Sequence, residues 1–222
     1  RHPSARSCSL APFDSVYCGD TNRLRGASGK MRVAMSNVGT PGVSSTHEAE
    51  RLKRLRSYAL LGRPSDPELD ALARLAAFAC HAPMAMVNLV EEDRVWVRAR
   101  CGVEFGDAPR DAMMCTQTVA AGAPLIIPDL TRDQRFASSP FVAGAPWVRF
   151  YAGVPLLTDD GFALGTVCVL DSTPRSLAEG ELCALQTIAH QVMAWLESQR
   201  TALTLQTVIE QTADGIVIAD DR

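Results

Sequence analysis

Two apolar runs joined by a short acidic turn constrain the fold of this chain more than any other feature. The runs cover residues 150–157 and 163–170, and Asp159-Asp160-Gly161 lies between them. Asp-Gly between two apolar runs is the strongest short-range signal of a β-hairpin. The sequence therefore predicts two neighbouring antiparallel strands in the second half of the chain.

Two helices are expected near the start of the ordered part. Ser45 or Thr46 caps the first, which ends before Gly62. Asp66-Pro67 opens the second, because proline is well tolerated in a first helical turn.

A further hairpin is expected over residues 84–99, with an apolar first strand over 84–90. Along its second strand apolar side chains alternate with arginines: Val95, Val97 and Ala99 against Arg94, Arg98 and Arg100. Only Trp96 breaks the pattern, on the arginine side. The alternation predicts a strand with one face in water.

Shorter elements and a long final helix complete the pattern. A short helix from Asp111 and a short strand over 124–128 precede a loop over 131–147. Ser176 and Glu179 match a capping box, which starts a long helix. Local hairpins with flanking helices describe an antiparallel sheet covered by helices on at least one face, an α+β domain.

The final helix carries a stripe that continues past the expected end of the domain. Its members recur at alternating spacings of three and four: Leu182, Leu185, Ala189, Val192, Leu196, Gln199, Leu203 and Gln206. This period favours a parallel helix pair between two copies of the chain, a homodimer. The alternative is that the first half of the stripe packs only on the chain's own sheet.

Composition and missing motifs exclude several classes of function. The 222 residues are 47% hydrophobic and 21% charged with a net charge of -3, so a globular domain is expected and nucleic-acid binding is not. The seven cysteines are scattered without a CxxC pair, which predicts neither disulfides nor a metal site and favours the reducing cytoplasm. No apolar stretch is long enough to span a membrane. Without a nucleotide-binding loop or hydrolase motif, no catalytic domain is expected in this chain.

Residues 1–46 are rich in Ser, Gly, Pro and Arg and show neither helical nor strand periodicity. Such a segment buries too little apolar surface to offset its chain entropy, so it is predicted to be disordered.

Several short segments between residues 48 and 200 resemble, in their order, the GAF domains of bacterial histidine kinases and diguanylate cyclases. They are residues 51–61, 88–96, 128–136, 149–156 and 165–171. The resemblance implies a GAF domain over residues 47–200, with an antiparallel sheet flanked by helices and a long C-terminal signalling helix. It also implies a sensory role in signal transduction.

The tail from Val208 to Asp220 resembles the opening helix and first strand of a PAS domain. Residues 201–222 are therefore assigned to a linker helix and the start of a truncated PAS domain. GAF followed by PAS implies a multidomain sensor with a later output domain. A histidine kinase of a two-component system is preferred over a diguanylate cyclase.

The resemblance further implies a pocket for a small ligand between the sheet and the short helices over it. The candidate lining residues are Asn88, Trp96, Cys115, Phe136, Arg149 and Tyr151. The guanidinium of Arg149 suits a carboxylate or phosphate. The alternative is that Arg149 forms an ion pair with Asp129 or Asp133 that fixes the long loop. The sequence identifies neither the ligand nor a cofactor.

Cys115 follows two methionines on the expected short helix. Packing is favoured over a reactive thiol or a cofactor anchor. In bilin-binding GAF domains the anchoring cysteine is typically followed by His, whereas Cys115 is followed by Thr116-Gln117, so tetrapyrrole attachment is not expected. Trp96 is favoured as a partly buried platform rather than a stacking surface for a ligand.

Three functions stay open on the sequence. In the favoured one, a ligand or redox change in the pocket shifts the exit helix of a dimer. The second is a free methionine sulfoxide reductase of the GAF type, for which Cys101 and Cys115 are the plausible thiol pair. The third is a ligand-free structural dimerisation module with a filled pocket.

Overall fold

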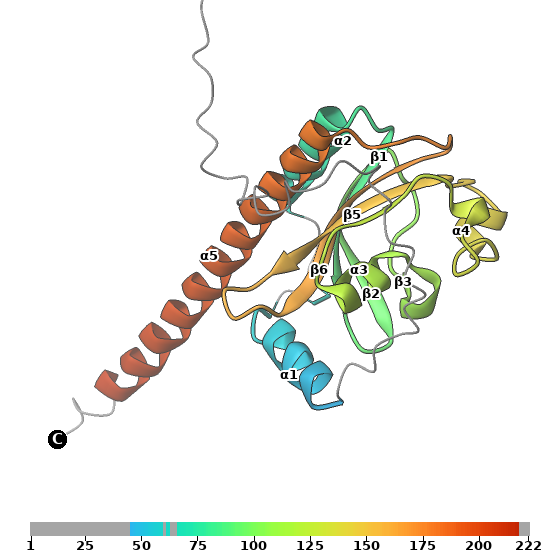
Figure 1. The fold of residues 1–222 in the computed structure, drawn as a ribbon. Coiled ribbons are helices and arrows are strands. Elements are labelled where there is room, and N and C mark those ends of the chain that lie inside the picture. Colours follow the sequence, from blue (N-terminus) through green and yellow to red (C-terminus); the bar gives the residue numbers. More distant parts are fainter. Residues whose placement is uncertain (1–44, 60, 63–65, 218–222) are drawn as a thin grey trace, which may run out of the picture. The chain divides into compact units, whose positions relative to one another are not determined.

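The computed structural model describes residues 45–59, 61–62 and 66–217, which belong to one compact unit (Figure 1). Most of the segment predicted to be disordered lies outside the described residues, and so does the end of the predicted PAS segment, residues 218–222.

In the described part of the chain, antiparallel strands form a single sheet. The strands are β1 (Met84–Val90), β2 (Arg94–Cys101), β3 (Ala108–Pro109), β4 (Leu125–Ile127), β5 (Phe150–Leu157) and β6 (Ala163–Asp171). Their order is β3-β2-β1-β6-β5-β4. Both predicted hairpins are present, as β1–β2 and β5–β6, and they meet through β1 and β6. The predicted α+β fold is confirmed.

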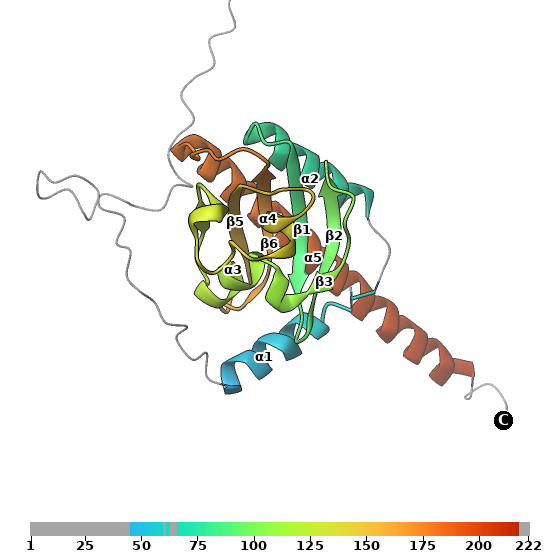
Figure 2. The same ribbon diagram turned by 90° about the vertical axis from the view of Figure 1, so that its right-hand side faces the viewer.

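Helices cover both faces of this sheet (Figures 1 and 2). They are α1 (Ser45–Arg56), α2 (Pro67–Ala79), α3 (Cys115–Ala121), α4 (Pro140–Ala143) and α5 (Glu179–Val217), with two 3-10 turns, η2 (Arg110–Ala112) and η3 (Leu130–Arg132). Helices α2 and α5 lie against one face, and α3 and α4 lie over the other. The helix predicted from Asp111 begins only at Cys115, because residues 110–112 form the tighter turn η2.

Alternate residues of the strands fill two separate cores, one on each face. Against α2 and α5 lies the helix-side core, which includes Leu55, Leu69, Ala73, Val87, Leu89, Val167, Leu185, Val192 and Leu196. Beneath α3, α4 and their loops lies the loop-side core, which includes Met86, Val90, Met113, Met114, Cys115, Leu130, Phe136, Val148, Tyr151, Cys168 and Leu170.

A β-bulge changes the alternation of β2. Asn88 pairs with Val97 and Val87 pairs with Ala99, so Arg98 is an extra residue between two registered pairs. Val97 therefore packs on the loop-side core and Ala99 on the helix-side core. The prediction that these two residues share a face, opposite arginines in water, is wrong beyond the bulge, and Arg98 is only 4% exposed.

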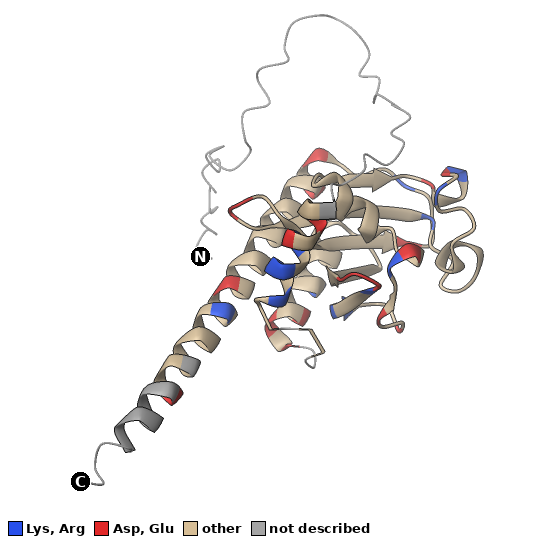
Figure 3. Ribbon diagram, turned by 90° about the horizontal axis from the view of Figure 1, so that it is seen from below, with Lys and Arg blue, Asp and Glu red and all other residues tan. Residues whose placement is uncertain are grey.

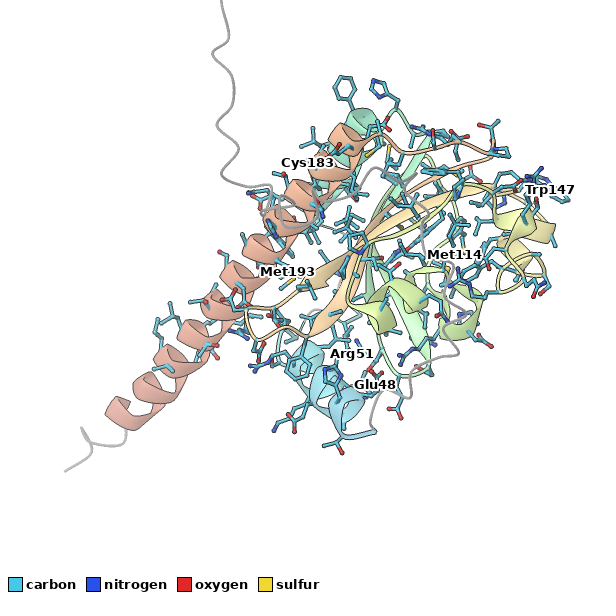
Figure 4. All side chains as sticks on the ribbon, viewed as in Figure 1. Glu48, Arg51, Met114, Trp147, Cys183 and Met193 are labelled. Carbon is cyan, nitrogen blue, oxygen red and sulfur yellow. The ribbon has the colours of Figure 1, made fainter. Side chains whose placement is uncertain are left out.

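Helix α1 is fixed to the sheet by a buried arginine (Figure 4). Arg51 donates two hydrogen bonds of 2.8 Å to the carboxylate of Glu48, and its Nη1 donates to the carbonyl oxygens of Val90 and Ala163. Arg110 donates to the same carboxylate at 2.6 Å. Burial opposes ionisation of Glu48, but the hydrogen bonds and charges of the two arginines outweigh it and lower the pKa of its carboxyl to about 2.

Helix α5 begins later than its predicted cap. The side chain of Glu181 accepts a 2.7 Å hydrogen bond from the backbone N–H of Ala178, which is half of a capping box and lies two residues beyond the predicted pair, Ser176 and Glu179. The helix then continues to Val217, through the first residues of the predicted PAS strand.

The stripe on α5 divides into two parts. Its members from Leu185 to Leu196 are buried in the helix-side core, so this part packs within the chain. Of its later members, Leu203 is half-buried and Gln206 is exposed. Leu205, Val208 and Ile209, which do not belong to the predicted stripe, are 59%, 53% and 67% exposed.

None of the helices, over the residues that the structure describes, is both long and apolar enough to cross a membrane.

Candidate ligand cavity

A small cavity lies inside the loop-side core, between the sheet and the segments that carry α3 and α4. Its volume is about 10 Å³. That is about the space needed for one water molecule. The sheet contributes its floor through Met86, Asn88, Tyr151, Cys168 and Leu170.

The remaining walls come from segments far away in the sequence. Met113, Met114 and Cys115 approach from the start of α3, and Val148 from the loop before β5. Figure 4 shows Met114 between α3 and the sheet.

Two aromatic rings from different segments close the outer side. Phe105, between β2 and β3, and Phe141, on α4, have ring centroids 4.7 Å apart. Both side chains are half-buried and line the cavity. The two rings therefore join two separate segments at the cavity wall.

Asn88 is the least satisfied polar group at this site. Its side chain is fully buried, and its Nδ2 donates a long, weak hydrogen bond to Cys168 Sγ at 3.5 Å. Its Oδ1 has no hydrogen-bond partner. A buried acceptor without a donor costs about 1–3 kcal/mol. A bound species that donates a hydrogen bond to this oxygen, or that carries positive charge, would recover part of that cost.

The titratable groups of the cavity are held in their neutral forms. Burial raises the pKa of the Cys168 thiol to about 12 and raises that of Cys115 further. Burial likewise raises the pKa of Tyr151 well above its usual range, and its hydroxyl lies 2.8 Å from Thr118 Oγ1. Neither thiol is a nucleophile in this state, because the thiolate is the reactive form.

Three of the six predicted site residues line this cavity: Asn88, Cys115 and Tyr151. Phe136 is buried in the same core but does not line the cavity. Trp96 packs on the opposite face, against the helix-side core, where its Nε1 donates to Glu91 at 2.8 Å.

Arg149 lies beside the cavity, in the loop that covers it. Its Nη1 donates to the carbonyl oxygens of Val142 at 2.8 Å and Val148 at 3.0 Å. The aspartates proposed as its partners pair with other arginines: Asp129 with Arg132 and Asp133 with Arg135. Arg149 therefore fixes the loop through backbone carbonyls rather than through an ion pair.

The GAF domain family model matches residues 66–195. This chain belongs to the GAF family. The match covers the whole sheet, the cavity and most of both cores.

Known relatives agree with this assignment. The chain is 32% identical over 155 residues to the cyclic di-GMP phosphodiesterase PA2567 of Pseudomonas aeruginosa, a match covering 69% of this chain and 26% of that protein. The chain thus spans about a quarter of the length of this relative.

Solved structures share the GAF fold at low sequence identity. The GAF domain of a phosphoenolpyruvate-protein phosphotransferase from Coxiella burnetii is similar with a TM-score of 0.55 and 12% identity, over 72% of this chain and 99% of that one. Free methionine-R-sulfoxide reductase from Neisseria meningitidis is similar with a TM-score of 0.52 and 18% identity, over 71% of this chain and 92% of that one.

Most lining residues of this GAF cavity were not predicted from the sequence. Cys168 was not singled out, and neither Met86 nor Phe105 was considered. The only local signal was the run Met113-Met114-Cys115, in which only the cysteine was singled out.

Proposed function

We propose that this GAF domain is the input module of a bacterial signal-transduction protein, in which a small ligand in the cavity changes the position of α5. The observation that supports this most is Asn88: a fully buried side chain in the cavity wall whose Oδ1 has no partner. A vestigial, filled pocket gives no reason to keep such a group, because an apolar side chain of the same shape would avoid its desolvation cost.

The strands offer a short mechanical route from the cavity to α5. In β6, Cys168 lines the cavity, whereas its neighbours Val167 and Val169 point into the helix-side core. Since α5 packs on that core through Leu185 and Val192, a shift of β6 is felt by the helix. Packed cores respond to small shifts by switching between arrangements rather than deforming continuously.

A polar clamp marks the point where α5 leaves the domain. The hydroxyl of Tyr58, after α1, hydrogen-bonds to the carboxylate of Glu197 on α5. Arg200 pairs with Glu197 at 2.9 Å and lies over the Tyr58 ring at 5.0 Å. This clamp links the last turn before the exposed part of α5 to α1.

The exposed part of α5 supports the proposal of a homodimer. Leu205, Val208 and Ile209 are spaced by three and one residues and form an exposed apolar stripe, which is not the stripe predicted from the sequence. Between Arg200 and Glu210 the helix carries no charged residue (Figure 3). Pairing of two α5 helices along this stripe would remove it from water and would let one domain's shift act on its partner.

The similarity to a cyclic di-GMP phosphodiesterase supports an output in cyclic di-GMP metabolism, rather than the histidine kinase that was preferred from the sequence. A cytoplasmic location of this domain is compatible with either output. The output lies outside the residues that carry the GAF match.

The reductase alternative is less well supported. Its proposed thiol pair is divided by the sheet, because Cys101 packs against the helix-side core and Cys115 belongs to the loop-side core. Cys115 is also only 1% exposed. A resolving thiol has to reach the nucleophile, and these two side chains lie on opposite faces.

Native mass spectrometry of the 222-residue chain, purified from a bacterial cytoplasm, tests the proposal. We expect a dimer that carries a small adduct, with the adduct lost in Asn88→Leu and the dimer lost in a double variant, Leu205→Gln with Ile209→Gln. The matched control is Leu157→Gln, which replaces an exposed leucine on β5. An adduct-free monomer, or a dimer equally weakened by the control, would instead favour a passive module.

A further inference from the structure

Sulfur is concentrated on one side of the sheet. The loop-side core buries Met84, Met86, Met113, Met114, Cys115 and Cys168, whereas the larger helix-side core buries only Cys80 and Met193. All but Met84 of the first group line the single small cavity described above. Figure 4 shows Met114 and Met193 on these two sides.

The sulfur atoms approach the cavity from two directions. On the floor, Met86 of β1 and Cys168 of β6 are direct cross-strand partners on the same face. Side chains in such pairs have Cβ atoms about 4.5–5.5 Å apart. From the other side come three consecutive residues, Met113, Met114 and Cys115. Residues that carry thioether and thiol groups thus line a space of about 10 Å³ from both sides.

Apart from the Tyr151 hydroxyl, which is hydrogen-bonded to Thr118, the polar and sulfur groups of the cavity mainly offer lone pairs. Thioether sulfurs only accept hydrogen bonds, and thiols are weak donors. The unpaired Oδ1 of Asn88 is also an acceptor. An occupant that suits these groups is electron-poor, and the volume limits it to about the size of a water molecule.

We propose that this cavity binds a monovalent copper ion, Cu(I), through the thiolate of Cys168 and the thioethers of Met86, Met113 and Met114. Thiolate and thioether ligands select Cu(I), whereas carboxylates and carbonyls suit Mg²⁺, Ca²⁺ and Mn²⁺. No group of three or more His, Cys, Asp and Glu residues in the described ranges could hold a metal ion, so a Zn²⁺ site of the usual kind is not available there. The inference rests on the proposed function, because it names the ligand of the same cavity.

Charge balance also favours a monovalent ion. On binding, the S–H bond of one thiol breaks, a Cu–S bond forms and the proton leaves to solvent, with no change of oxidation state. One thiolate and one Cu(I) give a neutral site, which removes the cost of a buried, isolated charge. Cys168 is the ligating thiol, and Asn88 Nδ2 lies within hydrogen-bond distance of its Sγ at 3.5 Å.

The test is an anaerobic titration of the reduced 222-residue chain with Cu(I), in competition with a chromogenic Cu(I) chelator. We expect one Cu(I) per chain, and X-ray absorption with sulfur as the only strong scatterer. Affinity should fall at least tenfold in Cys168→Ala and in the double variant Met113→Leu with Met114→Leu. The leucine variant keeps the volume of the core while removing its sulfur, so it separates ligation from packing.

Two matched controls lie on the other side of the sheet: Met193→Leu and Cys183→Ala should leave the affinity unchanged. Circular dichroism and urea unfolding verify that each variant is folded. Failure to hold Cu(I) against the chelator overturns the inference. So does affinity that survives the cavity variants, which would show adventitious binding by other thiols.

The two proposals fail separately. If Cu(I) is not held but native mass spectrometry shows another adduct that Asn88→Leu removes, the copper inference falls and the input function stands. If neither Cu(I) nor any adduct is bound, both fall.

Discussion

The helix-side core and the loop-side core share the same strands but are filled with different side chains. Against α2 and α5 the residues are mainly leucine, valine and alanine, and regular helices cover them. Beneath α3 and α4 the core is rich in methionine and cysteine, is covered largely by loops and short helices, and contains an unpaired polar atom.

This difference separates rigidity from adaptability within one small domain. Branched aliphatic side chains pack in few rotamers, whereas methionine fills irregular gaps and repacks at low cost. The side that holds the exit helix is therefore built to keep its geometry. The side that holds the cavity is built to admit an occupant.

The largest effect on the free energy of unfolding is expected when one buried leucine is removed from each core in turn. Leu185→Ala removes a fully buried side chain from α5 and should lower the free energy of unfolding by about 4 kcal/mol. Leu170→Ala, at 1% exposure in the cavity wall, should cost only about 3 kcal/mol, because neighbouring methionines can relax into the space. Urea unfolding of both variants measures the difference, provided that the two m-values are equal. Equal costs, or a greater cost for Leu170→Ala, would contradict the contrast between the cores.

A second prediction concerns the ion pair between Arg51 and Glu48, which holds α1 to strands β1 and β6. Arg51 binds the carbonyls at the end of β1 and the start of β6, and Glu48 neutralises it. Glu48→Gln should cost about 2 kcal/mol, less than the ~3–5 kcal/mol for breaking a fully buried pair, because the Glu48 side chain is 26% exposed. The exposed Glu50→Gln on the same helix is the control, with almost no expected effect.

The same pair sets a pH dependence. The pKa of Glu48 is lowered in the folded chain, so its contribution is complete above the ordinary value of 4.5 and is lost as the pH falls toward about 2. Unfolding free energies over this acidic range should therefore fall less steeply in Glu48→Gln than in the unchanged chain. Parallel curves would show that the carboxylate is not held by Arg51 and Arg110 in solution.

Local patterns were sufficient for much of the fold. The predicted strand over 84–90 and the cap at Asp66 appear in the structure as expected, with Asp66 accepting from the N–H of Glu68 at 2.9 Å. These features depend on residues close in sequence. The same holds for the Asp160-Gly161 turn, where Gly161 adopts φ 85°, the left-handed region that favours glycine.

The site was harder to predict because it depends on register and on distant segments. Asn88 and Trp96 were assigned to one pocket, but they lie on opposite faces of the sheet. Arg149 was matched to aspartates because charges are visible in a sequence, whereas the carbonyls that it binds are not. The contact between Phe105 and Phe141 joins segments whose proximity no local period reveals.

A fourth prediction concerns the hydrogen bond between two buried polar side chains of the loop-side core, Thr118 and Tyr151. Thr118→Val removes the hydrogen bond to the buried Tyr151 hydroxyl and should cost about 1 kcal/mol, since a satisfied buried pair is broken. Thermal and urea unfolding both measure this. A cost near zero would mean that Tyr151 finds another partner.

The smallest change in the free energy of unfolding is expected for Asn88→Leu. Its sign distinguishes a residue kept for packing from one kept for a ligand. Asn88→Leu replaces an amide whose Oδ1 has no partner, and the weak contact from Nδ2 to Cys168 is all that it loses. The free energy of unfolding without added ligand should therefore change by less than about 1 kcal/mol, in the stabilising direction. If Asn88 were kept for packing, its replacement would lower the free energy of unfolding, as we expect for Thr118→Val. If Asn88→Leu is stabilising and also abolishes binding in the cavity, the asparagine is retained for its ligand at the expense of stability, which is the behaviour expected of a functional site.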